Sequence, residues 1–462
     1  MATTRTFAIR TFGCQMNEHD SERLAGLLVA DGLVPASDGA EADLIVLNTC
    51  TIRDNADQRL YGTLGHLKAL KDARPGLQIA VGGCAAQKDR ERIAERAPWV
   101  DVVFGTHNLA AAPALLRRAQ IEGPLVEVLD APDPEVSRDA APALYAVREL
   151  AFAAWVTIQT GCDNSCAYCI VPAVRGPEIS RPVADLVTEV TRLAASGVSE
   201  VTLLGQNVNS YGRDITGRRP LFADLLRAIG AIEGIERVRF TSPHPKDLRP
   251  ETIAAMAETP AVCPQLHLPL QSGSDRVLSA MRRGYRVERY QRLLAAARAA
   301  IPDLAVTTDL IVGFPGESDA EFDETLAVVA ACDFDSAYTF IFSPREGTRA
   351  AGMTASFVDP ARIQERFVRL KEVVDRSALR RHEARVGRLE EVLVEGPSRR
   401  DEAVRSGRTR QGKLIHLPDP TLRAGALVEA RVTHGAPHFL LGEVVRTLRP
   451  PRHKIRVPLA VS

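Results

Sequence analysis

The stretch Gly161–Cys169, GCDNSCAYC, carries three cysteines in the spacing Cys-x3-Cys-x2-Cys and follows an apolar run, 152–159, that we predict to be a strand. Zinc sites usually show paired Cys-x2-Cys units or added histidines that complete four ligands. Here three thiols are close in sequence and no fourth ligand is nearby. Three thiolates suit a 4Fe–4S cluster that leaves one iron open, so Cys162, Cys166 and Cys169 are the predicted ligands.

The region around this stretch is strongly periodic from 151 to about 353. Helical patterns such as 182–195 and 287–300 separate six strand-like runs. These runs are 152–159, 200–204, 237–241, 265–270, 305–312 and 336–342. Six β/α units in series predict a partial (β/α)6 barrel with its site at the carboxyl ends of the strands. A long amphipathic helix, roughly 360–386, then leaves the barrel, so this domain is assigned to 151–386.

A second group of cysteines lies before the barrel, in a region (1–113) that alternates strands with helices and predicts an open parallel α/β domain. The predicted strands are 6–12, 43–48, 78–82 and 101–104, and the predicted helices include 21–31 and 56–71. Cys14, Cys50 and Cys84 each fall just past the end of a strand. Loops at the carboxyl ends of parallel strands share one edge, so these cysteines are expected to converge on a second cluster site. A chance arrangement of three buried cysteines is the alternative.

The remaining segments have weaker patterns. Residues 114–150 contain a run rich in proline, aspartate and alanine and are predicted to be a linker. Residues 387–450 alternate strand-like runs with turns, which predicts a small OB-like β-barrel of about 60 residues. Residues 451–462 are left as a tail. The predicted architecture is therefore α/β with three domains.

Composition limits the class of protein. The chain has 462 residues, of which 45% are hydrophobic and 25% charged, as in water-soluble globular proteins. It has no apolar run of the roughly 20 residues that span a bilayer, and Met1–Arg10 reads directly into a strand rather than a signal peptide. We therefore expect a cytoplasmic protein that does not contact a membrane. In such a protein Cys263 and Cys332, which stand alone, are interpreted as buried hydrophobic residues.

Charge does not by itself indicate a nucleic-acid-binding protein, because 58 basic residues balance 58 acidic ones. One local cluster of arginines could contact phosphates, or could be a solvated helix face followed by a basic loop. Its members are Arg376, Arg380, Arg381, Arg385, Arg388, Arg399, Arg400, Arg405, Arg408 and Arg410.

The cysteine spacing at the end of the first barrel strand resembles that of the radical S-adenosylmethionine (SAM) superfamily, as does Tyr168 before the third cysteine. The resemblance implies that SAM binds the open iron and is split into methionine and a 5′-deoxyadenosyl radical. Gly205 and Gln206, in LLGQNVNSYG, stand where the superfamily has a Gly-Gly-Glu-like group for the SAM amine, so Gln206 is a candidate amine acceptor. Gln271, Asp309 and Glu317 end later strands, either as ligand contacts or as loop caps; no catalytic side chain is assigned.

The whole domain order resembles the radical SAM methylthiotransferase family over nearly all of the chain. That resemblance implies a second 4Fe–4S cluster on Cys14, Cys50 and Cys84, two SAM molecules per turnover, and a last domain that is an RNA-contacting TRAM module. The segments TFGCQMNEHDSE, NTCTIRDNADQRLYGTLG, VFGTHN and SGRTRQGKLIHLP resemble members that place a methylthio group on C2 of N6-isopentenyladenosine beside the tRNA anticodon. The implied partners are the anticodon stem-loop and an electron donor such as flavodoxin or ferredoxin, and we expect a monomer.

Two alternatives remain at this point. A sibling methylthiotransferase acting on threonylcarbamoyladenosine in tRNA, or on an aspartate of a ribosomal protein, would share both groups of cysteines. A non-catalytic RNA-binding protein with structural zinc belongs to a different class.

Overall fold

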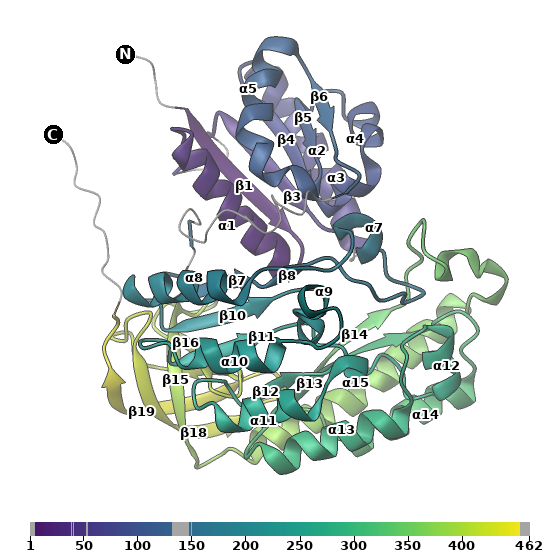
Figure 1. Ribbon diagram of the computed structural model, residues 1–462, viewed down its shortest axis with the longest axis vertical. Coiled ribbons are helices and arrows are strands. Elements are labelled where there is room, and N and C mark those ends of the chain that lie inside the picture. The colour runs from purple at the N-terminus through teal and green to yellow at the C-terminus, as the bar shows by residue number, and fades with distance from the viewer. Residues whose placement is uncertain are drawn as a thin grey trace.

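The computed structural model describes residues 5–452, apart from 38, 40, 52–53, 132–146 and 149. Three parts follow one another along the chain, as Figure 1 shows: an amino-terminal sheet domain (purple to blue), a central barrel (teal to green) and a small carboxyl-terminal barrel (yellow). This is the α/β architecture that the sequence predicts. No helix among the described residues is both long and apolar enough to cross a membrane.

The amino-terminal domain is a six-stranded parallel sheet in the order β2-β1-β3-β4-β5-β6. Its strands are β1 (Thr6–Phe12), β2 (Val34–Pro35), β3 (Leu44–Thr49), β4 (Gln78–Gly83), β5 (Val102–Phe104) and β6 (Leu125–Glu127). Its helices are α1 (Gln15–Ala30), α2 (Asp54–Ala73), α3 (Cys84–Asp89), α4 (Glu91–Arg96), η1 (Thr106–Ala111) and α5 (Ala112–Glu122). Apolar side chains of β3 and β4 alternate between the two faces of the sheet, where α1 and α5 cover one face and α2, α3 and α4 the other. Both faces are therefore buried, as in other parallel sheets.

This sheet continues past Pro113, where the sequence analysis places the start of a linker. Helix α5 crosses that position and buries Leu115 and Leu116 on the sheet, and β6 then pairs with β5. The predicted boundary is therefore too early, because β6 has only three residues and gives almost no periodic signal. Most of the rest of the predicted linker lies outside the described residues, as does most of the 451–462 tail.

The central barrel contains all six predicted strands. They are β7 (Ala153–Thr157), β10 (Glu200–Leu204), β11 (Arg237–Phe240), β12 (Gln265–His267), β13 (Ala305–Val312) and β14 (Ser336–Ile341). Parallel pairing joins β7, β10 and β11, and separately β12, β13 and β14, with a single bridge from Val238 to Val262 between the two groups. The short pair β8 (Gln159–Thr160) and β9 (Ile179–Ser180) lies beside the first strand. The six strands therefore form an open, partial barrel.

Helices on the outside of the barrel bury its strands. They are α8 (Val183–Ala195), α10 (Phe222–Gly230), α11 (Pro250–Glu258), α12 (Asp275–Ala280), α13 (Val287–Ala300), α14 (Asp319–Cys332) and α15 (Pro360–Glu383). Shorter helical segments are α7 (Val171–Arg175), η3 (Val208–Ser210), α9 (Arg213–Thr216), η4 (Pro245–Asp247), η5 (Ala350–Gly352) and η6 (Thr354–Ser356). Leu370 and Val374 of α15 join the same apolar core, so the predicted long helix packs on the barrel as it leaves it.

The carboxyl-terminal domain is a closed five-stranded barrel in the order β15-β16-β17-β19-β18, as predicted. Its strands are β15 (Leu389–Pro397), β16 (Arg405–Thr409), β17 (Leu414–Leu417), β18 (Leu427–Gly435) and β19 (Leu440–Arg449). Closure leaves no sheet edge exposed to other chains.

This small barrel packs against the amino-terminal ends of the central strands, opposite the ends where the predicted site lies. Arg237, the first residue of β11, is 1% exposed and donates to the carbonyl of Arg408 at 2.8 Å and to the Glu391 carboxylate at 3.0 Å. Lys413, in the hairpin between β16 and β17, pairs with Asp335 at 2.6 Å just before β14. The hairpin therefore covers the central barrel at the amino-terminal ends of its strands.

Most arginines of the cluster proposed for phosphate contact make hydrogen bonds or ion pairs within the chain. Six of its members make ion pairs within the chain, and Arg405 donates to three backbone carbonyls. The ion-paired members are Arg380, Arg381, Arg385, Arg388, Arg408 and Arg410. Within the part of the chain that the structure describes, only Arg376, Arg399 and Arg400 of the cluster are exposed without a side-chain partner. For the arginines that already have partners within the chain, contact with phosphates stays a prediction.

Candidate metal centres

The three amino-terminal cysteines converge at one edge of the sheet. Cys14 follows β1, Cys50 follows β3, and Cys84 is the first residue of α3 after β4. The Cys14 and Cys50 side chains are hydrogen-bonded to each other, and Cys84 is close enough for its charge to act on Cys14. Cys50 and Cys84 are buried. The three cysteines are spread over 70 positions of the sequence, and the parallel topology brings them together.

Local packing fixes the edge that carries this first triad. Asn17 donates to the Thr49 carbonyl at 3.2 Å, and Asn48 donates back to the Asn17 carbonyl at 2.8 Å, which joins the start of α1 to the end of β3. Gly83 has a left-handed backbone (φ +90°), and a Cβ there would overlap Asn48 and the Thr49 backbone. Only glycine lets the chain turn into Cys84 at this close approach.

The second triad lies in the loop between β8 and α7. Asn164 donates to the Cys162 sulfur at 3.5 Å, and Arg283 donates to the Cys166 sulfur at 3.4 Å. Backbone hydrogen bonds hold the loop, including one from the Cys169 amide to the Cys166 carbonyl at 3.1 Å. The thiols of all three residues are close enough to interact electrostatically.

Burial raises the pKa of thiols in both triads, and a hydrogen bond reverses this effect at Cys14. It raises the pKa of the Cys162 thiol to about 11 and that of Cys169 to about 12, so both are protonated at neutral pH in the metal-free chain. The hydrogen bond with Cys50 lowers the pKa of Cys14 to about 6, whereas burial raises the pKa of Cys84. Ionising buried thiols is costly, and metal coordination offsets that cost because the ligand form is the thiolate.

Both triads fit an iron–sulfur cluster better than a single ion. Among the described residues, no group of three or more His, Cys, Asp or Glu side chains is arranged tightly enough to hold one metal ion. Each triad offers three sulfurs, one fewer than the four ligands that usually hold structural zinc. Three thiolates leave one iron of a 4Fe–4S cluster open. All six cysteines therefore remain the predicted ligands.

The predicted SAM-binding residues lie around the second triad. The Tyr168 hydroxyl accepts from Arg283 at 3.3 Å. Gly205 follows β10, where a Cβ would come within 2.9 Å of Gln159. The buried Gln206 Oε1 has no hydrogen-bond partner in the described structure, so it is free to accept from a ligand. An unpaired buried oxygen is costly unless a ligand completes it.

The three polar residues left open by the sequence divide into different roles. Glu317 is buried, pairs with Arg366 at 2.9 Å and accepts from the Gly313 amide, so it is a loop cap. Gln271 adopts a left-handed backbone (φ +71°), and its buried Oε1 has no partner among the described residues. Asp309 lies 3.3 Å from His267 on the inner side of β13.

Aromatic side chains of β14 lie next to Asp309 and His267, on the same inner side of the barrel. Tyr338 pairs with Asp309 in the strand register, and its ring lies 6.2 Å from that of His267 in an edge-on arrangement. Tyr338 is 61% exposed and Phe340 is 40% exposed. Exposed aromatic rings beside polar groups are typical of nucleobase-binding surfaces.

The two triads are neighbours in space. Ile170, the residue after Cys169, packs with Val174 against Cys84. Thr106 of the sheet domain donates to the Val174 carbonyl at 2.7 Å, and Arg175 pairs with Asp20 at 2.8 Å. Helix α7 therefore joins one triad directly to the other.

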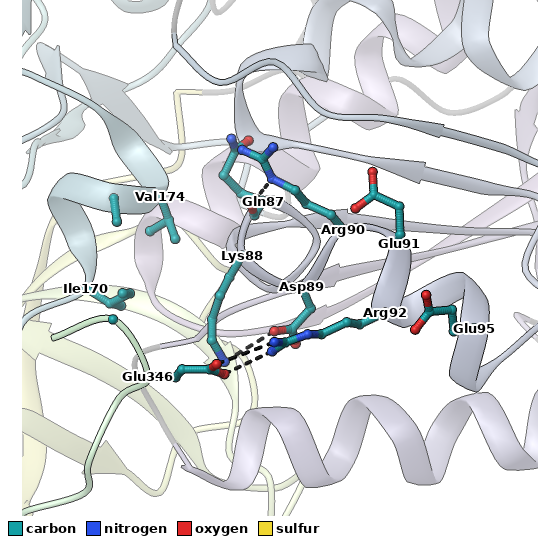
Figure 2. Close-up of a pocket in the computed structure, with 12 residues that line it drawn as sticks. Gln87, Lys88, Asp89, Arg90, Glu91, Arg92, Glu95, Ile170, Val174 and Glu346 are labelled. Atoms are coloured by element: carbon teal, nitrogen blue, oxygen red, sulfur yellow. Dashed lines mark hydrogen bonds and ion pairs between the residues drawn. The ribbon is translucent and has the colours of Figure 1, made fainter. Parts of the chain in front are cut away.

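A cleft of about 610 Å³ opens on the outer side of this junction, as Figure 2 shows. It lies between α3, α4, α7 and the loop after β14, and Arg92 spans it to Glu346 at 2.9 Å. Its charged lining carries both signs, and none of the six cysteines lines it. The cleft therefore lies beside the contact between the two domains and is not the predicted reaction site.

Sequence reasoning missed the two buried arginines at the triads, Arg175 and Arg283. Arg283 belongs to a loop more than a hundred positions from Cys166, so spacing could not reveal it. Arg175 lies six positions after Cys169, and a basic residue so near a cysteine motif was a usable signal.

Comparison with known proteins agrees with this division of the chain. Residues 6–105 match the uncharacterized protein family UPF0004, 156–329 match the radical SAM superfamily, and 383–445 match the TRAM domain. A solved structure of the radical S-adenosylmethionine methyltransferase TsrM from Kitasatospora setae shares the fold, with a TM-score of 0.52 and 14% identity over 76% of this chain and 77% of that chain. The fold and the matched domains define a radical SAM protein with a TRAM domain, which confirms the predicted class and its SAM and iron–sulfur cofactors.

The particular family follows from two relatives of nearly full length. The tRNA-2-methylthio-N(6)-dimethylallyladenosine synthase of Parafrankia sp. (strain EAN1pec) is 54% identical over 95% of this chain and 90% of its own. The protein of the same name from Streptomyces coelicolor (strain ATCC BAA-471 / A3(2) / M145) is 54% identical over 95% of this chain and 87% of its own. The chain belongs to the tRNA-2-methylthio-N(6)-dimethylallyladenosine synthase family.

Proposed function

We propose that this chain adds a methylthio group to C2 of N6-dimethylallyladenosine (isopentenyladenosine) beside the anticodon of tRNA. It uses two 4Fe–4S clusters and two SAM molecules per turnover. The observation that carries the proposal is the contact of Ile170 and Val174 with Cys84, because Ile170 directly follows Cys169 of the second triad. A sulfur-carrying site and a radical-forming site must share a reaction space, and this junction supports that arrangement.

The C2 hydrogen of adenine is neither usefully acidic nor easily displaced, so ordinary acid–base catalysis offers little. When bound, the cluster at Cys162, Cys166 and Cys169 supplies the electron that cleaves SAM, and the cluster at Cys14, Cys50 and Cys84 carries the sulfur. The protein's own task is to position and protect the reactants.

Side chains of the barrel would perform that positioning. Gln206, whose buried Oε1 has no partner among the described residues, would accept from the SAM amine, and Gly205 lets the backbone pass closely by Gln159. Tyr338 and Phe340 offer aromatic faces on which a base that has left the anticodon-loop stack could pack. Bases in single-stranded loops are the usual targets of sequence-specific RNA recognition.

We further propose a cytoplasmic monomer that takes electrons from flavodoxin or ferredoxin. The sheet domain and the small barrel each pack on the central barrel of the same chain, which supports function without a second copy.

Mass analysis of tRNA nucleosides from a strain that lacks this gene tests the proposal. The wild-type gene should restore the methylthio form of dimethylallyladenosine, and a gene with Cys14, Cys50 and Cys84 replaced by alanine should not. Restoration by the triple variant would contradict the sulfur-carrying role of the first triad. Restoration of methylthio-threonylcarbamoyladenosine, or of a modified ribosomal aspartate, would identify a sibling activity instead.

A further inference from the structure

The guanidinium of Arg175 extends from the radical SAM region toward the first triad, where its positive charge acts on Cys14 and Cys84. It lies at the end of α7 and is 7% exposed. Its electrostatic partners are Asp20, Cys84 and Cys14, and it hydrogen-bonds Cys84. Arg175 Nη2 lies 2.8 Å from the Asp20 carboxylate, and this ion pair holds the guanidinium beside the first triad.

The packing around α7 holds this side chain in place. Val174 and Ile170 contact Cys84, and the Val174 carbonyl accepts from Thr106 of the sheet domain. The loop that carries the second triad leads directly into α7. The last residue of that helix, Arg175, therefore brings its positive charge to the first triad. The second triad has its own arginine, Arg283, at 3.4 Å from Cys166.

We propose that Arg175 is a positioning residue for the cluster bound by Cys14, Cys50 and Cys84, where its positive charge stabilises the reduced, more negative form. The inference rests on the proposed function in assuming that this triad binds a cluster. Net charge and hydrogen bonds to sulfur are among the factors that set iron–sulfur potentials, and a buried cation acts strongly because solvent does not screen it. The negative charge of Asp20, the ion-pair partner of Arg175, disfavours the reduced form.

The test uses the full chain with Cys162, Cys166 and Cys169 replaced by alanine, so that only the first triad can hold a cluster. Iron content is measured first; its absence at the first triad would refute the proposed function, independently of Arg175. The reduction potential is then measured by redox titration followed by electron paramagnetic resonance. Arg175→Met should make reduction at least about tenfold less favourable, a shift of about 59 mV for one electron. Arg175→Lys should retain most of the wild-type potential.

Two further variants keep the test decisive. Asp20→Asn removes the opposing charge and should shift the potential upward, so it decides the question if Arg175→Met fails to fold. Arg283→Met, at the other triad, should leave this potential unchanged. An unchanged potential in a cluster-loaded Arg175→Met protein, or a downward shift in Asp20→Asn, would overturn the proposal.

Discussion

Gly161 decides whether the second triad can form. Its backbone is left-handed (φ +78°), and a Cβ there would overlap the carbonyl of Pro177. Gly217 has nearly the same backbone (φ +75°) but open space around it. We expect Gly217→Ala to cost about 1 kcal/mol from backbone strain alone, and Gly161→Ala to cost about 3 kcal/mol because a clash is added. Denaturant midpoints and iron content of anaerobically purified proteins measure both effects; equal behaviour of the two variants would contradict this role.

Tyr338 provides a second test on a single side chain, at the inner face of the barrel. Removing an aromatic ring that stacks on a base costs about 1–3 kcal/mol, so Tyr338→Ala should raise the KM for tRNA by roughly tenfold or more. Ile121 is 88% exposed on α5, far from this face, and Ile121→Ala should change nothing. Steady-state kinetics with dimethylallyladenosine-containing tRNA distinguish the outcomes. An unchanged KM in the tyrosine variant would place the base elsewhere.

Among the helices and strands, the seam between α1 and β7 gives a pH-dependent prediction. His19 Nδ1 lies 2.8 Å from the Thr157 hydroxyl, and burial lowers the His19 pKa to about 3. The folded chain therefore keeps His19 neutral, whereas the unfolded chain protonates it below about pH 6.5. Its contribution to stability is present above that pH and is lost as the pH falls.

The expected loss between pH 7.5 and pH 5.5 is about 1.4 kcal/mol from this residue. His19→Gln should remove that share of the acid sensitivity while leaving the remainder. Denaturant midpoints of both proteins at the two pH values measure it. An identical drop in the two proteins would show that His19 is already charged in the folded state.

The docking of the small barrel depends on Arg237 at the start of β11. Removing one partner of a buried charged pair costs about 3 kcal/mol, so Arg237→Met should loosen the domain and expose the segment after α15 to proteases. Arg446 makes a similar pair with Glu429 at 3.0 Å but is solvent-exposed, and Arg446→Met should digest like the wild type. Equal digestion of all three proteins would contradict the docking role.

The sequence predicts regular elements well and interfaces poorly. All six barrel strands and the closed small barrel were predictable, because apolar alternation and turn residues report burial locally. Helix α1 begins at Gln15 rather than at Ser21, since its first turns bury polar residues such as Asn17 and Asp20 that break the apolar pattern. The roles of Arg237, Arg385 and Arg410 depended on partners far along the chain, which no local pattern contains.

At the level of the whole molecule, the three domains have different positions relative to the two triads. The sheet domain and the barrel bring two triads into contact through α7, while the TRAM barrel closes the opposite end of the central strands. Arg399 and Arg400 of that module are exposed between β15 and β16. The two triads and the TRAM barrel therefore lie at different ends of the central barrel.

Iron and sulfide content, measured after anaerobic reconstitution, tests the two-cluster arrangement most directly. Two 4Fe–4S clusters predict about eight irons per wild-type chain and about four after either triad is replaced by alanine. Each triple variant should also lose methylthiolation of tRNA. A wild-type chain with only about four irons, or a colourless protein that holds zinc, would contradict the account.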